Sequence, residues 1–290
     1  GKIFTSLGLI NMLISPMNSI PWVIAGFAES FASFKRVMRF LQREDLNYLE
    51  FYKIGQNKNN SNGGQNGNLL DLNDVGFGVT KTNQDNNQDS VKKLVKKISF
   101  SMKPGDKIGL YGPIGAGKTS LLKGLLAELN KLSGSISVNN FDSSEVEVSA
   151  DDSDNDFSPP KNQNQSFTYN FLKNGVAYCP QDPFIINASI FDNITLFAKN
   201  SPNNKILAIK CLEQVCLDDK KLNYNCGENG SKLSGGQKVK LSLARALYQI
   251  QMNNIKLFLI DEPFGATDKD VHKKITQILG EMPELKDVSI

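Results

Sequence analysis

The sequence predicts an α/β domain with a mixed or mostly parallel sheet, preceded by a segment long enough to cross a membrane. Two apolar runs, "GVAYCP" (175–180) and "IKLFLID" (255–261), are typical of buried strands. A third run, "KIGLYG" (107–112), ends in glycine just before the helical stretch "TSLLKGLLAEL" (119–129). Strands that alternate with helices indicate a mostly parallel sheet.

The membrane prediction depends on residues 3–28, which carry no charge. Such a length spans a bilayer, and membrane helices tolerate breaks of the kind that Pro16 and Pro21 introduce. The alternatives are a buried helix of a soluble domain and a signal peptide, although the basic leader and the cleavage pattern of a signal peptide are missing. Basic residues follow the apolar run and favour a cytosolic exit: Lys35, Arg36, Arg39 and Arg43.

Composition argues against a nucleic-acid-binding protein and against a zinc site. The net charge of +3 is too small to indicate a nucleic-acid-binding protein. The four cysteines lack paired C-x-x-C spacing, and the sequence has one histidine, so we do not expect a zinc site. We expect the cysteines to be reduced thiols. Because the chain begins with Gly1 rather than Met, we expect it to be a piece of a longer protein. Triplets of the N-x-[ST] type, Asn193 among them, arise by chance in such an Asn-rich chain.

Three polar tracts interrupt the apolar pattern. Residues 55–68 predict a flexible linker, and residues 81–90 an expanded hairpin loop. Residues 141–166 are strongly acidic and too polar to form a core, which predicts a disordered surface insertion. A regulatory phosphorylation segment is the alternative for this third tract.

A phosphate-binding loop follows the first predicted strand. "GPIGAGKT" (112–119) matches G-x-x-x-x-G-K-[ST] in full, between a strand and a helix. Gly115 and Gly117 allow backbone N–H groups to surround phosphate oxygens, and the helix start adds its dipole. We expect Lys118 to reach the β- and γ-phosphates and the Thr119 hydroxyl to bind Mg²⁺. The predicted nucleotide-binding set is Gly112, Pro113, Ile114, Gly115, Ala116, Gly117, Lys118, Thr119, Ser120 and Asp261.

Two further strand ends supply chemistry beside that loop. "LFLIDE" (257–262) ends in Asp261, which is placed to hold Mg²⁺ through water, and Glu262, which is placed to orient or deprotonate the attacking water. Gln181 follows the strand "VAYC" and is placed to contact Mg²⁺ or the attacking water and to report the nucleotide state. The predicted catalytic residues are Glu262 and Gln181, and the predicted metal ligands are Thr119, Gln181 and Asp261.

The stretch "LSGGQ" comprises Leu233, Ser234, Gly235, Gly236 and Gln237. Ser234 and Gln237 predict a capping box at a helix start. Two consecutive glycines weaken a helix, so a helix start alone does not explain them. Glycines there leave backbone N–H groups open to a second phosphate, which we expect to belong to a nucleotide on another domain.

In this order, the phosphate-binding loop, Gln181, "LSGGQ" and the Asp–Glu pair resemble the nucleotide-binding domain of ABC ATPases. "YGPIGAGKTSLL", "AYCPQDPFIINASIFDNI" and "GENGSKLSGGQKVKLSLARAL" look like the first such domain of the C subfamily, the multidrug-resistance-associated proteins. The resemblance implies an ATP-hydrolysing domain of an exporter that uses ATP and Mg²⁺. Its signature, "LSGGQ", would contact ATP held by a second nucleotide-binding domain, and Asp268 would lie in the D-loop at that interface.

The same resemblance implies the domain organisation. Residues 1–28 would be the last helix of a membrane domain, 29–68 a cytosolic helix with a polar linker, and 69–290 the nucleotide-binding domain. Within the latter, a helical subdomain would cover about 183–250, and the switch histidine would lie beyond Ile290. The full-length protein would be a multi-pass membrane protein with this domain in the cytosol and membrane domains as partners.

Several positions depart from the family pattern. The aromatic residue that stacks on adenine aligns with Val79, with Phe77 as a substitute. Glu262 stands where first domains of this subfamily often carry Asp, and Lys240 stands where Arg is usual. Two alternative functions remain: an ATP-gated channel or channel regulator of the same subfamily, and a soluble ABC-type ATPase acting on DNA or ribosomes. The near-neutral charge and the absence of a heptad run count against the soluble class.

Overall fold

The computed structural model divides the chain into two compact units, residues 1–45 and residues 46–290. The structure describes residues 2–42, 51–54, 67–82, 89–139, 141, 163–217, 221–253, 255–262 and 269–290.

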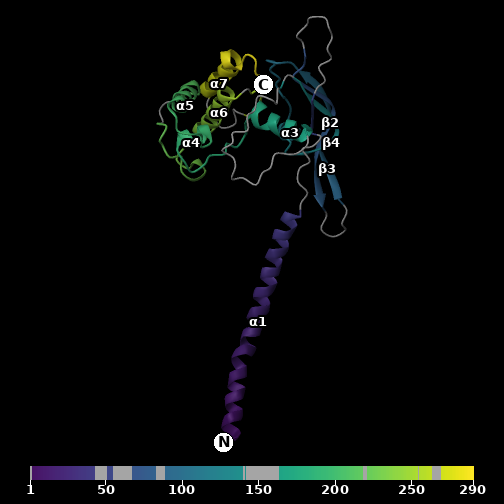
Figure 1. Ribbon diagram of the computed structural model, residues 1–290, viewed down its shortest axis with the longest axis vertical. Helices are drawn as coiled ribbons and strands as arrows, with labels where there is room; N and C mark the ends of the chain where they lie inside the picture. The colour runs from purple at the N-terminus through teal and green to yellow at the C-terminus, as the bar shows by residue number, and fades with distance from the viewer. Residues whose placement is uncertain are drawn as a thin grey trace. The chain divides into compact units, whose positions relative to one another are not determined.

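The first unit is one helix, α1 (Lys2–Leu41), drawn in purple in Figure 1. It continues through Pro16 and Pro21 and past residue 28, where the sequence analysis placed the end of the membrane segment. Its large apolar side chains are exposed all round, from Phe4 to Leu41. By length and composition alone, α1 is the one helix among the described residues that could cross a membrane.

The second unit contains a four-stranded sheet in the order β1-β4-β2-β3, in which β1 pairs parallel to β4 and the other pairs are antiparallel (Figure 1). Its strands are β1 (Tyr52–Ile54), β2 (Leu70–Thr82), β3 (Asp89–Met102) and β4 (Asn130–Val138). Thr82 pairs with Asp89, so β2 and β3 form the expected hairpin around the tract at 83–88, which lies outside the described residues. The mixed sheet that the sequence predicted is confirmed.

A second sheet pairs β5 (Val176–Cys179) in parallel with β6 (Leu257–Ile260). Both predicted strands are therefore confirmed. Along β6, Leu257 and Leu259 pack into the core of the four-stranded sheet, while Phe258 packs into a core made mainly of helices. Burial on both faces explains why these strands read as uninterrupted apolar runs.

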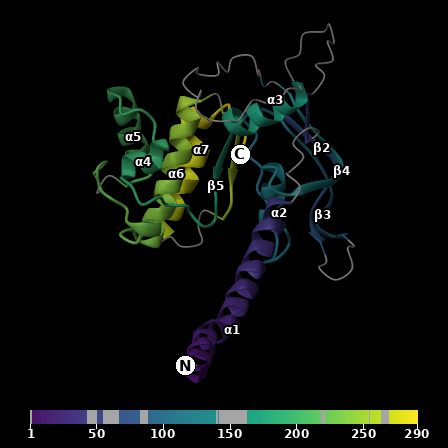
Figure 2. The same cartoon turned by 60° about the horizontal axis from the view of Figure 1, so that its bottom comes forward.

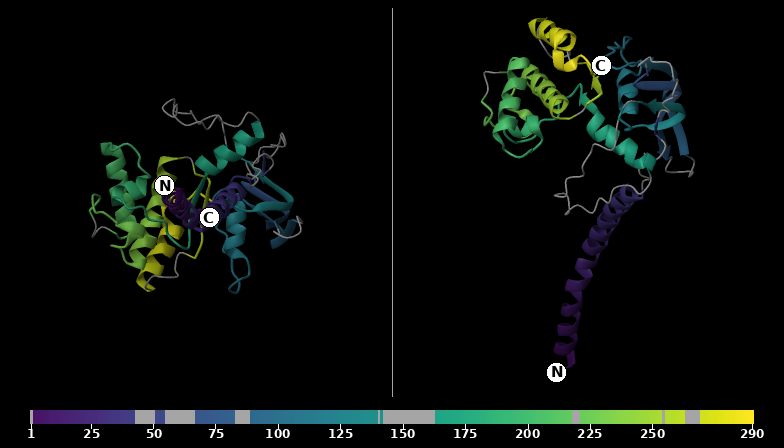
Figure 3. Two further views of the ribbon diagram at one scale, coloured as in Figure 1. Left: turned by 90° about the horizontal axis from the view of Figure 1, so that it is seen from below. Right: turned by 45° about the horizontal axis from the view of Figure 1, so that its top comes forward.

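The helical elements of the second unit are α2 (Lys118–Leu125), α3 (Gln163–Asn170), η2 (Phe171–Gly175), α4 (Ile190–Thr195), α5 (Pro202–Gln214), η3 (Glu228–Gly230), α6 (Gly235–Met252), α7 (Lys269–Glu281) and η4 (Pro283–Leu285). Helices α4, α5 and α6 pack against one another, and α6 contacts β5 (Figure 2). Figure 3 shows this group, in green, apart from the blue strands of the four-stranded sheet.

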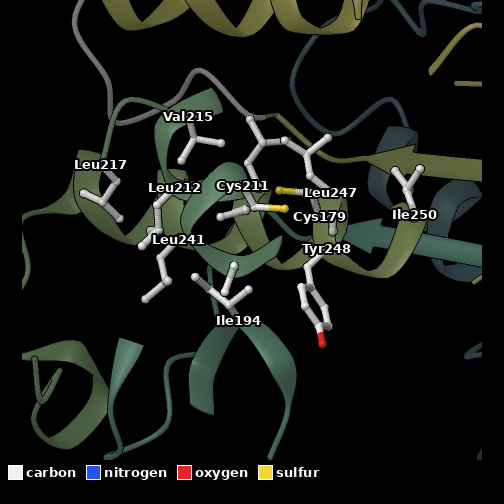
Figure 4. Packing of buried hydrophobic residues seen from close by; sticks show 14 of the residues in the cluster. Cys179, Ile194, Cys211, Leu212, Val215, Leu217, Leu241, Leu247, Tyr248 and Ile250 are labelled. Carbon is white, nitrogen blue, oxygen red and sulfur yellow. The ribbon is translucent and has the colours of Figure 1, made fainter. Parts of the chain in front are cut away.

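The helices pack around an apolar core that Figure 4 shows from close by. Its members include Leu212, Leu241 and Leu247, all at most 3 % exposed. Cys179 and Cys211 lie in the same core as free thiols, and burial raises the pKa of both. Their chemistry is therefore that of small apolar side chains.

One predicted strand is wrong. Residues 107–112 form no strand, and the exposed fraction of the Tyr111 side chain is complete (105 %). Among the described residues, backbone hydrogen bonds join only the start of this segment to another part of the chain: the Ile108 N–H donates to the Ile290 carbonyl (2.7 Å), and the Ile290 N–H donates to the Asp106 carbonyl (2.9 Å). Two hydrogen bonds to one residue do not make a ladder, and Gly109 and Gly112 add backbone freedom that opposes an extended strand.

The boundaries of two polar tracts also differ from the prediction. Strands β2 and β3 extend to Thr82 and back from Asp89, into both ends of the tract 81–90 that the sequence assigned to the hairpin loop. Strand β1, which the sequence did not predict, precedes the linker tract 55–68 and forms the edge of the four-stranded sheet. Residues 163–166, assigned to the insertion, belong to α3, and Phe141 packs edge-on against Phe167 and Phe171. Burial of these rings fixes both ends of the insertion on the domain, whereas residues 142–162 lie outside the described residues.

Candidate functional site

The phosphate-binding loop ends where α2 begins. Gly115 and Gly117 have φ of +81° and +95°, the left-handed region that favours glycine, and Gly117 is the residue that caps α2. Gly117 has no side chain with which to cap this helix start, so it leaves the first N–H groups of α2 without a capping acceptor. Ile114 is fully exposed at the tip of the loop. The loop therefore presents backbone donors and a helix dipole to an anion.

Lys118 stands in the first turn of α2 and folds back over the loop. Its Nζ donates to the carbonyls of Gly112 (3.0 Å) and Pro113 (3.2 Å). The same Nζ lies 3.8 Å from Oε1 of Glu262, and the two side chains are 22 % and 45 % exposed. Because the ion pair is long and half in water, its contribution to stability is small, and Lys118 is available to an incoming anion.

Thr119 meets Asp261 across the site. The Thr119 hydroxyl donates to Oδ1 of Asp261 (3.1 Å), and the Asp261 N–H donates to the Cys179 carbonyl on β5 (2.9 Å). Asp261 is only 2 % exposed, and its Oδ2 has no hydrogen-bond partner among the described residues. Burial, followed by the charge of Asp261, raises the pKa of Tyr178 to about 12. A buried carboxylate oxygen without a partner beside a hydroxyl suits a hard cation or its water.

Gln181 and Glu262 extend the same cluster. Nε2 of Gln181 donates to Oε2 of Glu262 over 2.8 Å. Glu262 has φ of +43°, a left-handed conformation that costs a non-glycine residue about 1 kcal/mol or more. Backbone strain of this kind gathers at functional sites. The structure thus brings together five predicted site residues, Lys118, Thr119, Gln181, Asp261 and Glu262.

The predicted capping box at "LSGGQ" is confirmed. The Gln237 N–H donates to the Ser234 hydroxyl (3.3 Å), and the Ser234 N–H donates to the Gln237 side chain (3.1 Å), at the start of α6. Leu233 is buried, whereas Ser234 and Gly235 are exposed. In the described part of the chain, no hydrogen bond or ion pair joins this stretch to the phosphate-binding loop.

Three other expectations have different outcomes. Phe77 is completely buried and stacks on Phe51 with 6.1 Å between ring centroids, so it is not available to a nucleotide base. Val79 is 39 % exposed and is the more accessible of the two. Asp268 lies outside the described residues. No group of three or more His, Cys, Asp or Glu side chains suited to a metal occurs within the described ranges.

A match to a known protein family covers most of this site. Residues 95–265, which include every residue of the Lys118 cluster and "LSGGQ", match the ABC transporter family. The chain belongs to the ABC transporter family. Domains of this family bind ATP and are ATPases coupled to transport. The sequence-based expectation of an ABC fold is therefore confirmed.

Several curated relatives that the chain resembles are members of the C subfamily. The chain is 30 % identical over 276 residues to ATP-binding cassette sub-family C member 10 of Mus musculus, and equally to the Homo sapiens protein of that name. It is 28 % identical over 288 residues to sub-family C member 3 of Rattus norvegicus. These alignments cover 93–96 % of this chain but only 15 % of each relative.

A solved structure supports the fold. The structure of a bacterial Atm1-family ABC exporter with ATP bound superimposes with a TM-score of 0.55 at 20 % sequence identity. The match covers 76 % of this chain and 34 % of that one. At this identity the likeness shows the fold alone.

Two residues of the ABC domain that sequence reasoning passed over form a part-buried polar contact. Asn193 seemed a chance glycosylation triplet, yet it is 0 % exposed and its side chain makes several hydrogen bonds. Arg245 was not singled out, yet its guanidinium donates to Asn193. A lone Arg within the apolar run "LARAL" was the available signal, since charged side chains are seldom buried without a partner.

Proposed function

We propose that residues 69–290 form an ATP-binding and ATP-hydrolysing domain of an exporter, in which ATP binding and hydrolysis drive transport across a membrane. The observation that carries this proposal is the cluster of Lys118, Thr119, Gln181, Asp261 and Glu262 around one loop, joined by contacts of 2.8–3.8 Å. These residue types supply what phosphoryl transfer to water requires: a cation for the phosphates, oxygen ligands for Mg²⁺, and a carboxylate for the attacking water.

Binding begins at the phosphate-binding loop. Lys118 exchanges the carbonyls of Gly112 and Pro113 for oxygens of the β- and γ-phosphates, while the backbone donors at Gly115 and Gly117 surround the phosphate chain. Thr119 and Asp261 would hold Mg²⁺, with Gln181 as the third predicted ligand. When bound, Mg²⁺ neutralises charge on the phosphates. The Asp261 Oδ2 atom, which has no partner among the described residues, fits this role.

Hydrolysis then depends on Glu262. Its carboxylate orients the water that attacks the γ-phosphorus, or accepts the proton of that water, while the bond between the γ-phosphorus and the β–γ bridging oxygen breaks and ADP leaves. The hydrogen bond from Gln181 fixes the direction of the Glu262 side chain before ATP binds. Because both residues follow strands of the same parallel pair, β5 and β6, a shift of either strand changes this geometry.

The remaining parts follow from two exposed features. The open start of α6 at "LSGGQ" would bind ATP held by a second nucleotide-binding domain. Asp268 would lie in the D-loop of this domain and contact that second domain. The part of α1 within residues 1–28 would be the last helix of the preceding membrane domain, because its apolar side chains face outward on all sides, and the rest of α1 would be the cytosolic helix. The nucleotide-binding domain would then lie in the cytosol and the full-length protein in a membrane.

The test is Mg²⁺-dependent ATP hydrolysis by the full-length protein in membranes. Glu262→Gln is expected to lower turnover by about 10²- to 10⁴-fold, the usual contribution of a positioned general base, while ATP binding is retained. Glu213→Gln, which changes an exposed carboxylate of α5, serves as the matched control and should hydrolyse ATP at the wild-type rate. Unchanged turnover in Glu262→Gln would remove Glu262 as the catalytic carboxylate.

A further inference from the structure

The side chain of Asn193 on α4 is hydrogen-bonded to the backbone of the segment that follows Gln181. Its Oδ1 accepts from the Ile186 N–H (2.9 Å), and its Nδ2 donates to the Ile186 carbonyl (3.0 Å) and to the Ser189 carbonyl (3.0 Å). The amide thus pairs with both backbone groups of Ile186, as a neighbouring strand would. Since Asn193 is 0 % exposed, water cannot replace these bonds without opening the domain.

Arg245 joins Asn193 to α6. Its Nε donates to the Asn193 carbonyl (2.6 Å) and its Nη2 donates to Oδ1 of the same residue (3.3 Å). In the described part of the chain no carboxylate pairs with Arg245, and burial lowers the pKa of its guanidinium. Ten residues of continuous helix, about 15 Å, separate Arg245 from Gly235 at the start of α6.

The segment after Gln181 also touches the loop that leads into "LSGGQ". The Cys226 N–H donates to the Ala188 carbonyl (2.9 Å). Gly230, with φ of +67°, packs so closely that an added Cβ would lie 3.1 Å from Cβ of Ile185. The segment 182–189 therefore contacts the loop that precedes Ser234, and through Asn193 it is also joined to Arg245 in α6.

We propose that Asn193 and Arg245 are positioning residues that keep Gln181 and "LSGGQ" in one rigid body. Gln181 contacts the catalytic carboxylate of this domain, while Ser234 begins the helix that faces the other nucleotide. A displacement of Gln181 on ATP binding is then transmitted through Ile186, Asn193 and Arg245 to α6. This inference rests on the proposed function, because it assigns the Asn193–Arg245 contact to coupling between two nucleotide sites.

A purely structural role makes a different prediction. If Arg245 only stabilised the core, its loss would lower the melting temperature and reduce ATP binding and turnover together. Positioning instead leaves the Lys118 site intact, because among the described residues no hydrogen bond or ion pair joins Lys118 or Thr119 to α4 or α6. ATP affinity would then be retained while turnover falls.

Arg245→Met and Lys240→Met form a matched pair for the test. Both remove a cation of α6 that donates to a backbone carbonyl, but Lys240 donates to Cys216 (2.9 Å) at the end of α5. In the full-length protein we expect Arg245→Met to lower turnover by about 10- to 100-fold with the Kd for ATP changed less than about twofold, and Arg245→Lys to recover part of the loss. Lys240→Met should keep wild-type turnover.

Amide hydrogen exchange tests the contact without any activity. The Ile186 amide should exchange about 10-fold faster or more in Arg245→Met and remain at the wild-type rate in Lys240→Met. Asn193→Asp covers the case in which Arg245→Met does not fold, because the new carboxylate pairs with Arg245 but repels the Ile186 carbonyl. It should raise the same exchange rate and lower turnover.

Two outcomes would overturn the inference: wild-type exchange and turnover in both Arg245→Met and Asn193→Asp, or a loss of ATP affinity that parallels the loss of turnover. Failure of the proposed function looks different. In that case the wild-type protein itself would neither bind nor hydrolyse ATP, whatever the exchange rate of Ile186.

Discussion

Replacement of Lys118 by alanine tests how the loop binds phosphate. In wild type, Nζ must give up hydrogen bonds to the Gly112 and Pro113 carbonyls before it contacts the nucleotide. A hydrogen bond to a charged group contributes about 1.5–3 kcal/mol, and a bond from Nζ to a charged phosphate oxygen lies about 1 kcal/mol above a bond from Nζ to a neutral carbonyl. Two phosphate contacts less two carbonyl contacts leave a net of about 2 kcal/mol, which predicts about a 30-fold rise in the Kd for ATP.

Lys123→Ala provides the control for that titration. Lys123 lies in the last turn of the same helix, α2, and is exposed, so its removal changes the net charge equally without touching the loop. The assay is a nucleotide titration of each variant by calorimetry at fixed ionic strength, because salt weakens contacts between exposed charges. An unaltered Kd in Lys118→Ala, or an equal loss in Lys123→Ala, would refute the assignment of Lys118.

Three further results are expected. Val79→Trp should lower the Kd for ATP at least about fivefold by adding a ring that stacks on adenine, which Phe77 cannot do from the core; an unchanged affinity would place the base elsewhere. Ser234→Ala should cost about 1 kcal/mol through loss of the capping box, seen as a fall of about 2–4 °C in the melting temperature, whereas the exposed Ser231→Ala should leave it unchanged. Burial raises the pKa of Cys211 from 9.0 to about 12, so above pH 9 the folded state keeps a proton that the unfolded state loses. The contribution of Cys211 to stability is therefore full below pH 9 and falls as the pH rises toward 12. Cys211→Ala should show a smaller fall in melting temperature than wild type between pH 8 and pH 10.

Local patterns predicted the parts of the fold that local forces determine. The capping pair of Ser234 and Gln237 and the strands β5 and β6 are found where their residue types indicate. The same holds for the start of α2, where glycines with positive φ precede Lys118. Each of these features depends on residues within a few positions of one another.

Contacts between distant segments were not readable in this way. Strand β1 was not predicted, because its three residues gain a partner only when they meet β4, about 80 positions later. Asn193 and Arg245 lie 52 positions apart, and neither pattern around them indicates the other. Residues 107–112 show the opposite error: an apolar run predicted a strand, but the described chain offers it little more than Ile290 as a partner.

The central claim is that the Lys118 loop and the Ser234 helix start contact phosphates of different nucleotide molecules. The most direct measurement uses the full-length protein carrying Ser234→Cys, whose new thiol is labelled by an ATP analogue with a thiol-reactive group on its γ-phosphate. The account predicts that labelling persists when Lys118→Ala is added, because the analogue is held by the loop of the other domain. Loss of labelling in the Lys118→Ala background would show that both elements serve one nucleotide and would contradict the account.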